Sequence, residues 1–270
     1  MKTQIILRKV HYAFSAFLCT ACLVSCNDWL KPEPLSFYSP ENTYVTKEGL
    51  EGALVSCRAM IRPEFIGNNS YACTELMTSD VAVAGNIVAQ TLKNFEIQLK
   101  PGAYGDSQIG TFWSKGYSAI QKANTIISRV QAADEITEND KNTILAEGYF
   151  HRSYWYYKLV NQFGDVPFID KEVTTPKLDF YSHTRSSILR RLREDMMFAT
   201  RYLPESAPHG AVSKAAGNHL LAKICLACCD FDGAVAATTA VIDHSQHKLM
   251  EKRFGVNISD AQYNIISDLF

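Results

Sequence analysis

The sequence predicts an all-α protein, a scaffold of repeat-like helical pairs with an irregular, loop-rich layer near its N-terminus. Apolar residues recur at steps of three and four along several long segments, which is the spacing of one buried helix face. Capping residues, glycine and proline stand between these segments, where they begin and end helices. With 47% hydrophobic residues among 270, the chain can bury a core, which excludes a disordered or low-complexity protein.

Residues 1–25 have the pattern of a lipoprotein signal peptide. Lys2, Arg8 and Lys9 form a positive start, and an apolar run ending in small residues follows them. Leu23-Val24-Ser25-Cys26 resembles the lipobox of bacterial lipoproteins, in which the signal is cut before the cysteine and acyl chains are attached to it. Cys26 is therefore the predicted lipidation site, and its acyl chains would anchor the protein without a spanning helix. The alternative is an ordinary secretory signal in which Cys26 has no role.

Residues 26–44 predict an extended tether, because Pro32, Pro34 and Pro40 prevent a regular helix. The folded domain is expected over residues 45–270. Its first helix is predicted over Lys47–Met60, with Leu50, Leu54 or Val55, and Ala59 on one face, and Arg62-Pro63 ends it. Residues 71–104 are the least regular part of the domain, since glycine and proline interrupt them.

Three further helices follow. The first, over residues 112–131, has one apolar stripe, and the second begins at a capping box, Thr137-x-x-Asp140, and ends at Gly164. Either Ser182 or Thr184 can cap the third, which Pro204 stops. The predicted buried positions of the three helices are Trp113, Tyr117, Ile120, Ala123, Ile127 and Val130; Ala146, Phe150, Tyr154, Tyr157 and Val160; and Leu189, Leu192, Met196, Ala199 and Leu203.

The last helical pair is expected over residues 211–243, around a tight turn at Cys229–Asp232 that Phe231 fills. This pair resembles a tetratricopeptide helical hairpin, although Cys229 stands where that motif usually has glycine. Residues 145–164 resemble the first helix of another such unit. Stacked units of this kind form a solenoid-like, tetratricopeptide-like scaffold.

No metal or cofactor site is predicted. Cys225-x-x-Cys228-Cys229 lies near His219, but it falls in an Ala- and Leu-rich helical stretch, where cysteines are expected to pack as small apolar residues. His244 and His247 share a helix face without an evident third ligand.

The sequence also carries no catalytic pattern. It has no phosphate-binding glycine loop, no HExxH and no nucleophile elbow, so an enzyme is not expected. The 27 basic and 28 acidic residues give no excess charge for nucleic acid. Without residues 1–25 the chain has a net charge of −4.

Several segments together resemble the SusD/RagB-type outer-membrane lipoproteins of Bacteroidetes. They are Cys26–Leu30 with its proline-rich tether, FWSKGYSAIQKAN, AEGYFHRSYWYYKLVNQFGDVPFI, the helix ending in Tyr202-Leu203-Pro204, and GAVSKAAGNHLLAKICLA. The resemblance implies a surface-exposed, lipid-anchored protein of the outer membrane that binds a glycan or oligopeptide nutrient. It would pass this ligand to a SusC-like TonB-dependent transporter.

The resemblance covers the N-terminal half of that family only, because family members are usually about twice as long. We therefore expect a chain truncated at its C-terminus. By position, the ligand-binding residues would be Asp80, Asn86, Asn94 and Tyr104. Whether calcium assists binding stays open. The alternative is a truncated helical-repeat interaction protein that contacts only the transporter and has no competent ligand site.

Overall fold

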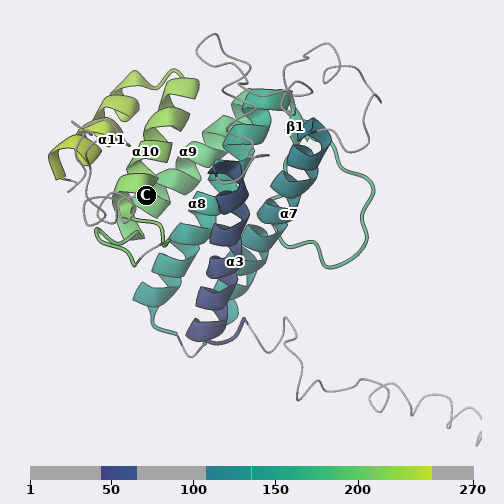
Figure 1. The fold of residues 1–270 in the computed structure, drawn as a ribbon, viewed down its shortest axis with the longest axis horizontal. Helices are drawn as coiled ribbons and strands as arrows, with labels where there is room; N and C mark the ends of the chain where they lie inside the picture. The colour runs from purple at the N-terminus through teal and green to yellow at the C-terminus, as the bar shows by residue number, and fades with distance from the viewer. Residues whose placement is uncertain (1–43, 66–107, 135, 209, 245–270) are drawn as a thin grey trace, which may run out of the picture. The chain divides into compact units, whose positions relative to one another are not determined.

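The computed structural model describes residues 44–65, 108–134, 136–208 and 210–244 of the chain (Figure 1). Within these ranges the fold is all-α apart from one short two-stranded hairpin, which confirms the predicted fold class. The elements are α3 (Lys47–Phe65), α7 (Gln108–Arg129), the 3₁₀ turn η2 (Val130–Ala132), α8 (Glu138–Phe163), β1 (Val166–Pro167), β2 (Ser182–His183), α9 (Arg185–Tyr202), α10 (Lys214–Ala227) and α11 (Phe231–His244). None of the helices in these ranges is both long enough and apolar enough to cross a membrane.

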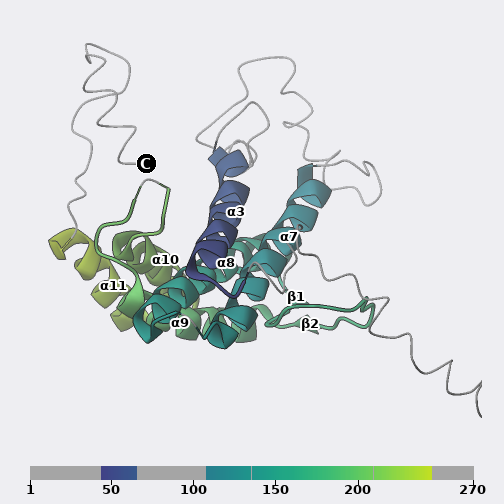
Figure 2. The same ribbon diagram turned by 90° about the horizontal axis from the view of Figure 1, so that it is seen from below.

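The helices pack in order along the chain. α8 packs against α7 and α9, α10 packs against α9 and α11, and α3 lies against α7 and α8 (Figures 1 and 2). α8 and α9 are connected by the β1–β2 hairpin, and a short turn connects α10 to α11, as in a helical-repeat scaffold. Several predicted features lie outside the described residues. They are the signal peptide, Cys26, the tether up to residue 43 and the irregular segment 71–104.

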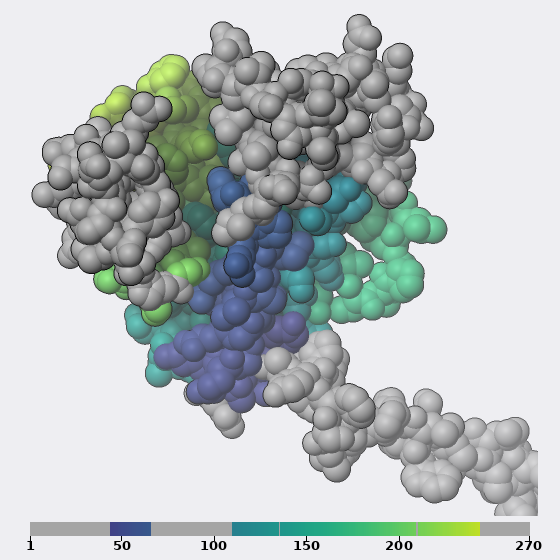
Figure 3. Space-filling model, viewed as in Figure 1, coloured from purple at the N-terminus to yellow at the C-terminus, as the bar shows by residue number. Residues whose placement is uncertain are grey.

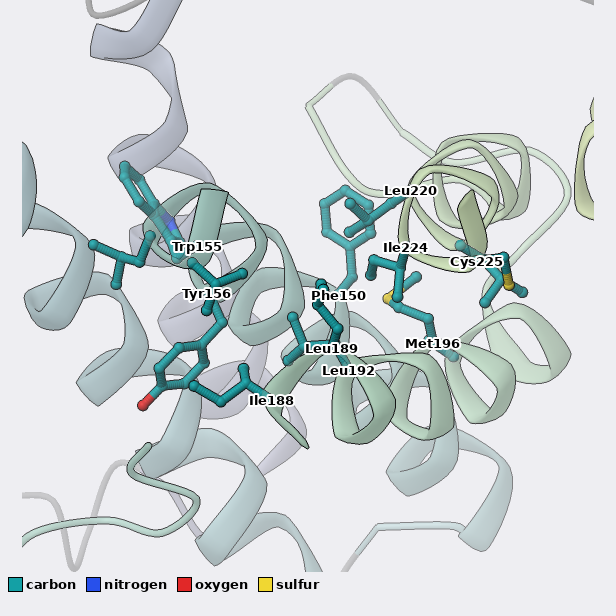
Figure 4. Close-up of a cluster of buried hydrophobic side chains, with 14 of the residues drawn as sticks. Phe150, Trp155, Tyr156, Ile188, Leu189, Leu192, Met196, Leu220, Ile224 and Cys225 are labelled. Carbon is teal, nitrogen blue, oxygen red and sulfur yellow. The ribbon is translucent and has the colours of Figure 1, made fainter. Parts of the chain in front are cut away.

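The main hydrophobic core lies between α8, α9 and α10 (Figure 4). Its fully buried side chains include Trp155 and Tyr156 of α8, Leu192 and Met196 of α9, and Ile224 of α10. Full burial of one such apolar side chain stabilises the fold by about 1.5–3 kcal/mol. A second cluster joins α3 to the C-terminal end of α7, the turn η2 and the N-terminal part of α8. It contains Leu50, Leu54, Cys57, Ile126, Val130, Ile144 and Leu145.

The structure confirms the predicted capping residues at both ends of α8 and at the start of α9. The hydroxyl of Thr137 accepts a hydrogen bond from the amide of Asp140 at 3.1 Å, and Thr184 rather than Ser182 caps α9 by accepting from the amide of Ser187. Gly164 ends α8 with φ +75°, a conformation that glycine adopts without steric cost. Ser182 instead pairs with Pro167 in the hairpin.

Two local predictions are wrong. α3 does not end at Arg62-Pro63 but continues to Phe65, because proline fixes a helical φ and removes only one hydrogen bond near the helix end. Phe231 does not fill the turn between α10 and α11, since 64% of it is exposed. The side chains of Ala234 and Ala237 are buried there instead, and their small size allows α10 and α11 to approach closely.

The apolar face of α3 differs from the prediction at Ala59, which is exposed. Leu54 and not Val55 is the buried one of the two alternatives, and Leu50 and Cys57 are buried with it. Burial raises the pKa of the Cys57 thiol to about 12, so this cysteine acts as a small apolar side chain.

Candidate functional site

The predicted ligand residues Asp80, Asn86, Asn94 and Tyr104, like the predicted lipidation site Cys26, lie outside the described residues. The structure therefore does not test these assignments, which stay predictions. Within the described ranges no group of three His, Cys, Asp or Glu side chains is arranged to hold a metal ion. Among the residues that the structure describes, the loop of the β1–β2 hairpin has the geometry of a binding site.

The β1–β2 hairpin begins immediately after α8. Val166 pairs with His183 and Pro167 with Ser182 in antiparallel register, and residues 168–181 form the loop between the two strands. Figure 2 shows this loop extending beyond the strands, away from α9. A loop of this length without secondary structure of its own is uncommon in a compact domain unless it has a function.

One face of α7 binds the backbone at the start of this loop. Polar side chains at steps of four, three and four residues point to it, which places them on the same side of the helix. Tyr117 donates to the Pro167 carbonyl at 2.8 Å, Gln121 to the Val173 carbonyl at 3.2 Å and Asn124 to the Ile169 carbonyl at 2.7 Å, while Ser128 accepts from the amide of Glu172 at 3.1 Å. The neighbouring Arg129 forms an ion pair with Glu172 at 2.7 Å.

α8 holds the same backbone from a second direction. The hydroxyl of Tyr156 accepts a hydrogen bond from the amide of Ile169 at 2.6 Å and lies 3.3 Å from the carbonyl oxygen of that residue. Burial raises the pKa of the Tyr156 and Tyr117 hydroxyls, so both stay protonated and available as donors at neutral pH.

Arg152 connects this loop to the interior. Its guanidinium is 1% exposed and donates to the carbonyl of Asp170 at 2.9 Å, to Asn124 Oδ1 at 3.3 Å and twice to Asp195 Oδ2, at 3.1 and 2.6 Å. The same group lies over the ring of Tyr149, 4.9 Å from its centre. A single buried cation therefore joins α7, α8, α9 and the hairpin loop.

The loop lines an open pocket with a volume of about 340 Å³. Small-molecule sites in proteins usually have volumes of about 300–1,000 Å³. The ring of Phe168 packs on Tyr156 with their centres 4.7 Å apart, and Lys177 lies 5.5 Å from the centre of the Phe180 ring. The pocket is lined by Phe168, Ile169, Asp170, Lys171, Glu172, Val173, Thr174, Thr175, Lys177 and Phe180. These side chains can bind a polar ligand with an apolar face.

Sequence reasoning did not identify Arg152, Asn124 or Asp195. A signal was present, because each is three or four residues from apolar positions on the same helix face: Asn124 from Ile120 and Ile127, Arg152 from Tyr156, and Asp195 from Leu192. A buried charge requires a partner, so an arginine and an aspartate on separate apolar stripes could have been matched to each other. The pairing itself needed the tertiary arrangement of α8 and α9.

A sequence profile for the SusD-like family, described as starch-binding proteins associating with the outer membrane, matches residues 50–226. Among curated relatives, SusD-like protein P2 of Formosa agariphila is 28% identical over 264 residues, and SusD-like protein P25 of the same organism is 24% identical over 274 residues. These alignments cover 96% and 98% of this chain but 50% of each relative, so the chain spans about half the length of the curated relatives it matches.

Solved structures share the fold. A SusD superfamily protein from Bacteroides vulgatus superposes with a TM-score of 0.67 at 18% identity, covering 82% of this chain and 48% of the other. A laminarin-binding SusD-like protein superposes with a TM-score of 0.63 at 22% identity, covering 74% of this chain and 46% of the other.

Proposed function

Because the chain belongs to the SusD-like family, we propose that it is a glycan-binding component of a nutrient uptake system at the outer membrane. The observation that carries the proposal is the family match over residues 50–226, which spans α3 to α10 and the hairpin loop. The laminarin-binding name of one structural neighbour supports polysaccharide as the ligand class. The role is binding without turnover, in line with the starch-binding description of the family.

The primary ligand contacts are proposed at Asp80, Asn86, Asn94 and Tyr104. They lie in the segment that joins α3 to α7, between Phe65 and Gln108. Amide and carboxylate groups can hydrogen-bond sugar hydroxyls, and a tyrosine ring can stack on a sugar face. An oligopeptide would use the same groups through its backbone.

The proposed setting of the protein is the outer face of the outer membrane. Acyl chains on Cys26 would hold it there, and each methylene buried in lipid contributes about 0.8 kcal/mol to anchoring. A SusC-like TonB-dependent transporter would then receive the bound glycan. A transporter directly beneath the binding protein raises the effective ligand concentration, so weak binding at each site is sufficient.

Affinity electrophoresis of the purified chain in gels containing laminarin, starch or xylan tests glycan binding. We expect retardation by at least one of these polysaccharides. The variant Asn86→Ala/Asn94→Ala should lose it, while Glu51→Ala on the exposed face of α3 should not. Mobility unchanged by every polysaccharide, together with co-purification with a SusC-like transporter, would support the alternative of a protein that contacts only the transporter.

Membrane attachment needs its own experiment. The chain should label with a fatty-acid probe and sediment with the outer membrane, and Cys26→Ala should abolish both. Labelling that survives this substitution would place the acyl chain on another residue and disprove the proposed anchor.

A further inference from the structure

We propose that the pocket of the β1–β2 loop is a second saccharide site, selective for an uncharged stretch of glycan. This inference rests on the proposed glycan-binding function but concerns a different part of the chain from residues 71–104. The space-filling view shows the loop at the right edge of the molecule, beside α7 (Figure 3).

Part of the pocket wall is held in place by the helices. The backbone from Pro167 to Val173 is held by the hydrogen bonds from α7 and α8 described above, and the buried guanidinium of Arg152 fixes Asp170 in the middle of that stretch. A ligand therefore does not have to order this part of the wall. Preorganisation of this kind lowers the entropy cost of binding.

The lining of the pocket has the chemistry of a sugar site. A sugar ring has an apolar face of C–H groups and a rim of hydroxyls, so its sites combine aromatic rings with hydrogen-bonding groups. Phe168 and Phe180 supply the rings, and the hydroxyls of Thr174 and Thr175 supply donors and acceptors. Phe180 is 40% exposed, and Tyr181, which follows it in the chain, is 78% exposed. Their exposed aromatic surface can stack on further sugar units.

The charges of the pocket lining are balanced. Two acidic side chains, Asp170 and Glu172, and two basic ones, Lys171 and Lys177, line the pocket. Glu172 is paired with Arg129, and Lys177 lies over the Phe180 ring. The pocket therefore has no excess positive charge for the sulfates or carboxylates of acidic polysaccharides. A neutral glycan loses no charge solvation on entering such a site, which favours it over an acidic one.

Hydrogen–deuterium exchange of the intact chain, with and without laminarin, tests the site directly. Laminarin is a neutral glucan, and we expect it to slow exchange in residues 168–181 as well as in residues 71–104. Alginate, an acidic polysaccharide, should not protect the loop. Protection confined to residues 71–104 would overturn the second site and leave the proposed function standing. Absence of protection throughout the chain would overturn both, and equal protection by alginate would overturn the selectivity for neutral glycans.

A matched pair of variants gives a second measurement. Phe180→Ala removes a ring of the pocket, and Leu178→Ala removes a side chain that is 99% exposed at the same loop and does not line the pocket. By calorimetry, Phe180→Ala should weaken laminarin binding about three- to tenfold, while Leu178→Ala should leave it unchanged. Circular dichroism melts will show whether both variants stay folded. Equal affinities for the two folded variants would contradict the proposal.

Discussion

Arg152 and Asp195 form an ion pair inside the protein, with side chains that are 1% and 3% exposed. The two residues come from the middle of α8 and α9, and Arg152 also carries the hydrogen bonds that reach Asn124 and the hairpin loop. Burial raises the pKa of the Asp195 carboxyl, while the nearby Arg152 guanidinium opposes this shift. The pair therefore depends on both partners being present.

Arg152→Ala should lower the free energy of unfolding by about 3–5 kcal/mol, because it leaves a buried carboxylate without its main partner. Arg191→Ala is the matched control. Its guanidinium is 46% exposed and lies 3.4 Å from the same carboxylate, so its loss should cost less than about 1 kcal/mol. Urea unfolding followed by circular dichroism measures both, and equal costs for the two variants would contradict this assignment.

The Arg58–Glu147 pair should make stability depend on pH. Burial of Glu147 disfavours its charge, but His151 and the two hydrogen bonds from Arg58, at 2.6 and 2.9 Å, outweigh burial and keep its pKa below the ordinary value. An acid with a lowered folded-state pKa stabilises the fold fully above its unfolded pKa, and this contribution is lost as pH falls through the folded value.

Glu147→Gln should therefore reduce the drop in the urea midpoint between about pH 5 and pH 3. At neutral pH it should cost about 1.5–3 kcal/mol, the range for a hydrogen bond to a charged group. Glu138→Gln, at the exposed start of the same helix, is the control and should leave both quantities close to those of the natural chain. A pH profile unaltered by Glu147→Gln would exclude this role.

An added Cβ atom would find much less room at position 217 than at position 52. A Cβ atom at Gly217 would lie 2.6 Å from Leu203 Cδ1, whereas one at Gly52 would meet nothing within 4 Å. Gly217→Ala should therefore destabilise the protein by about 1–3 kcal/mol through overpacking between α9 and α10. Gly52→Ala, at an exposed position of α3, should stabilise the protein by about 0.5–1 kcal/mol. Thermal unfolding checks both signs, and a stabilising Gly217→Ala would refute the close approach.

Cys229 takes a left-handed conformation, φ +60°, after α10, where glycine would fit without strain. The turn is closed by hydrogen bonds from the amides of Asp230 and Cys229 to the carbonyls of Cys225 and Leu226, at 2.9 and 3.1 Å. Cys229→Gly should raise the free energy of unfolding by about 0.5–1 kcal/mol, since relief of strain exceeds the added freedom of the unfolded chain. Cys229→Ala removes the thiol but keeps the strain, so it should give no such gain in the same unfolding assay.

Local sequence patterns were sufficient to predict the all-α class and most helix boundaries. Thr137, Gly164 and Thr184 act within one turn of the chain, so their roles follow from spacing alone. The apolar stripe of α9 was equally readable, because helical periodicity is local and all five of its predicted positions are buried.

Which polar side chains form hydrogen bonds with each other could be seen only once the helices were packed. Arg152 and Asp195 are separated by 43 residues, and Gln121 and Val173 by 52, so no local pattern connects them. The exposure of Phe231 also depends on tertiary packing. The sequence of a turn predicts the backbone conformation of the turn, but it does not predict which side chain fits between the packed helices. The pocket of the hairpin loop exists because α7 and α8 hold one stretch of backbone from two sides, and that arrangement depends on how the helices pack.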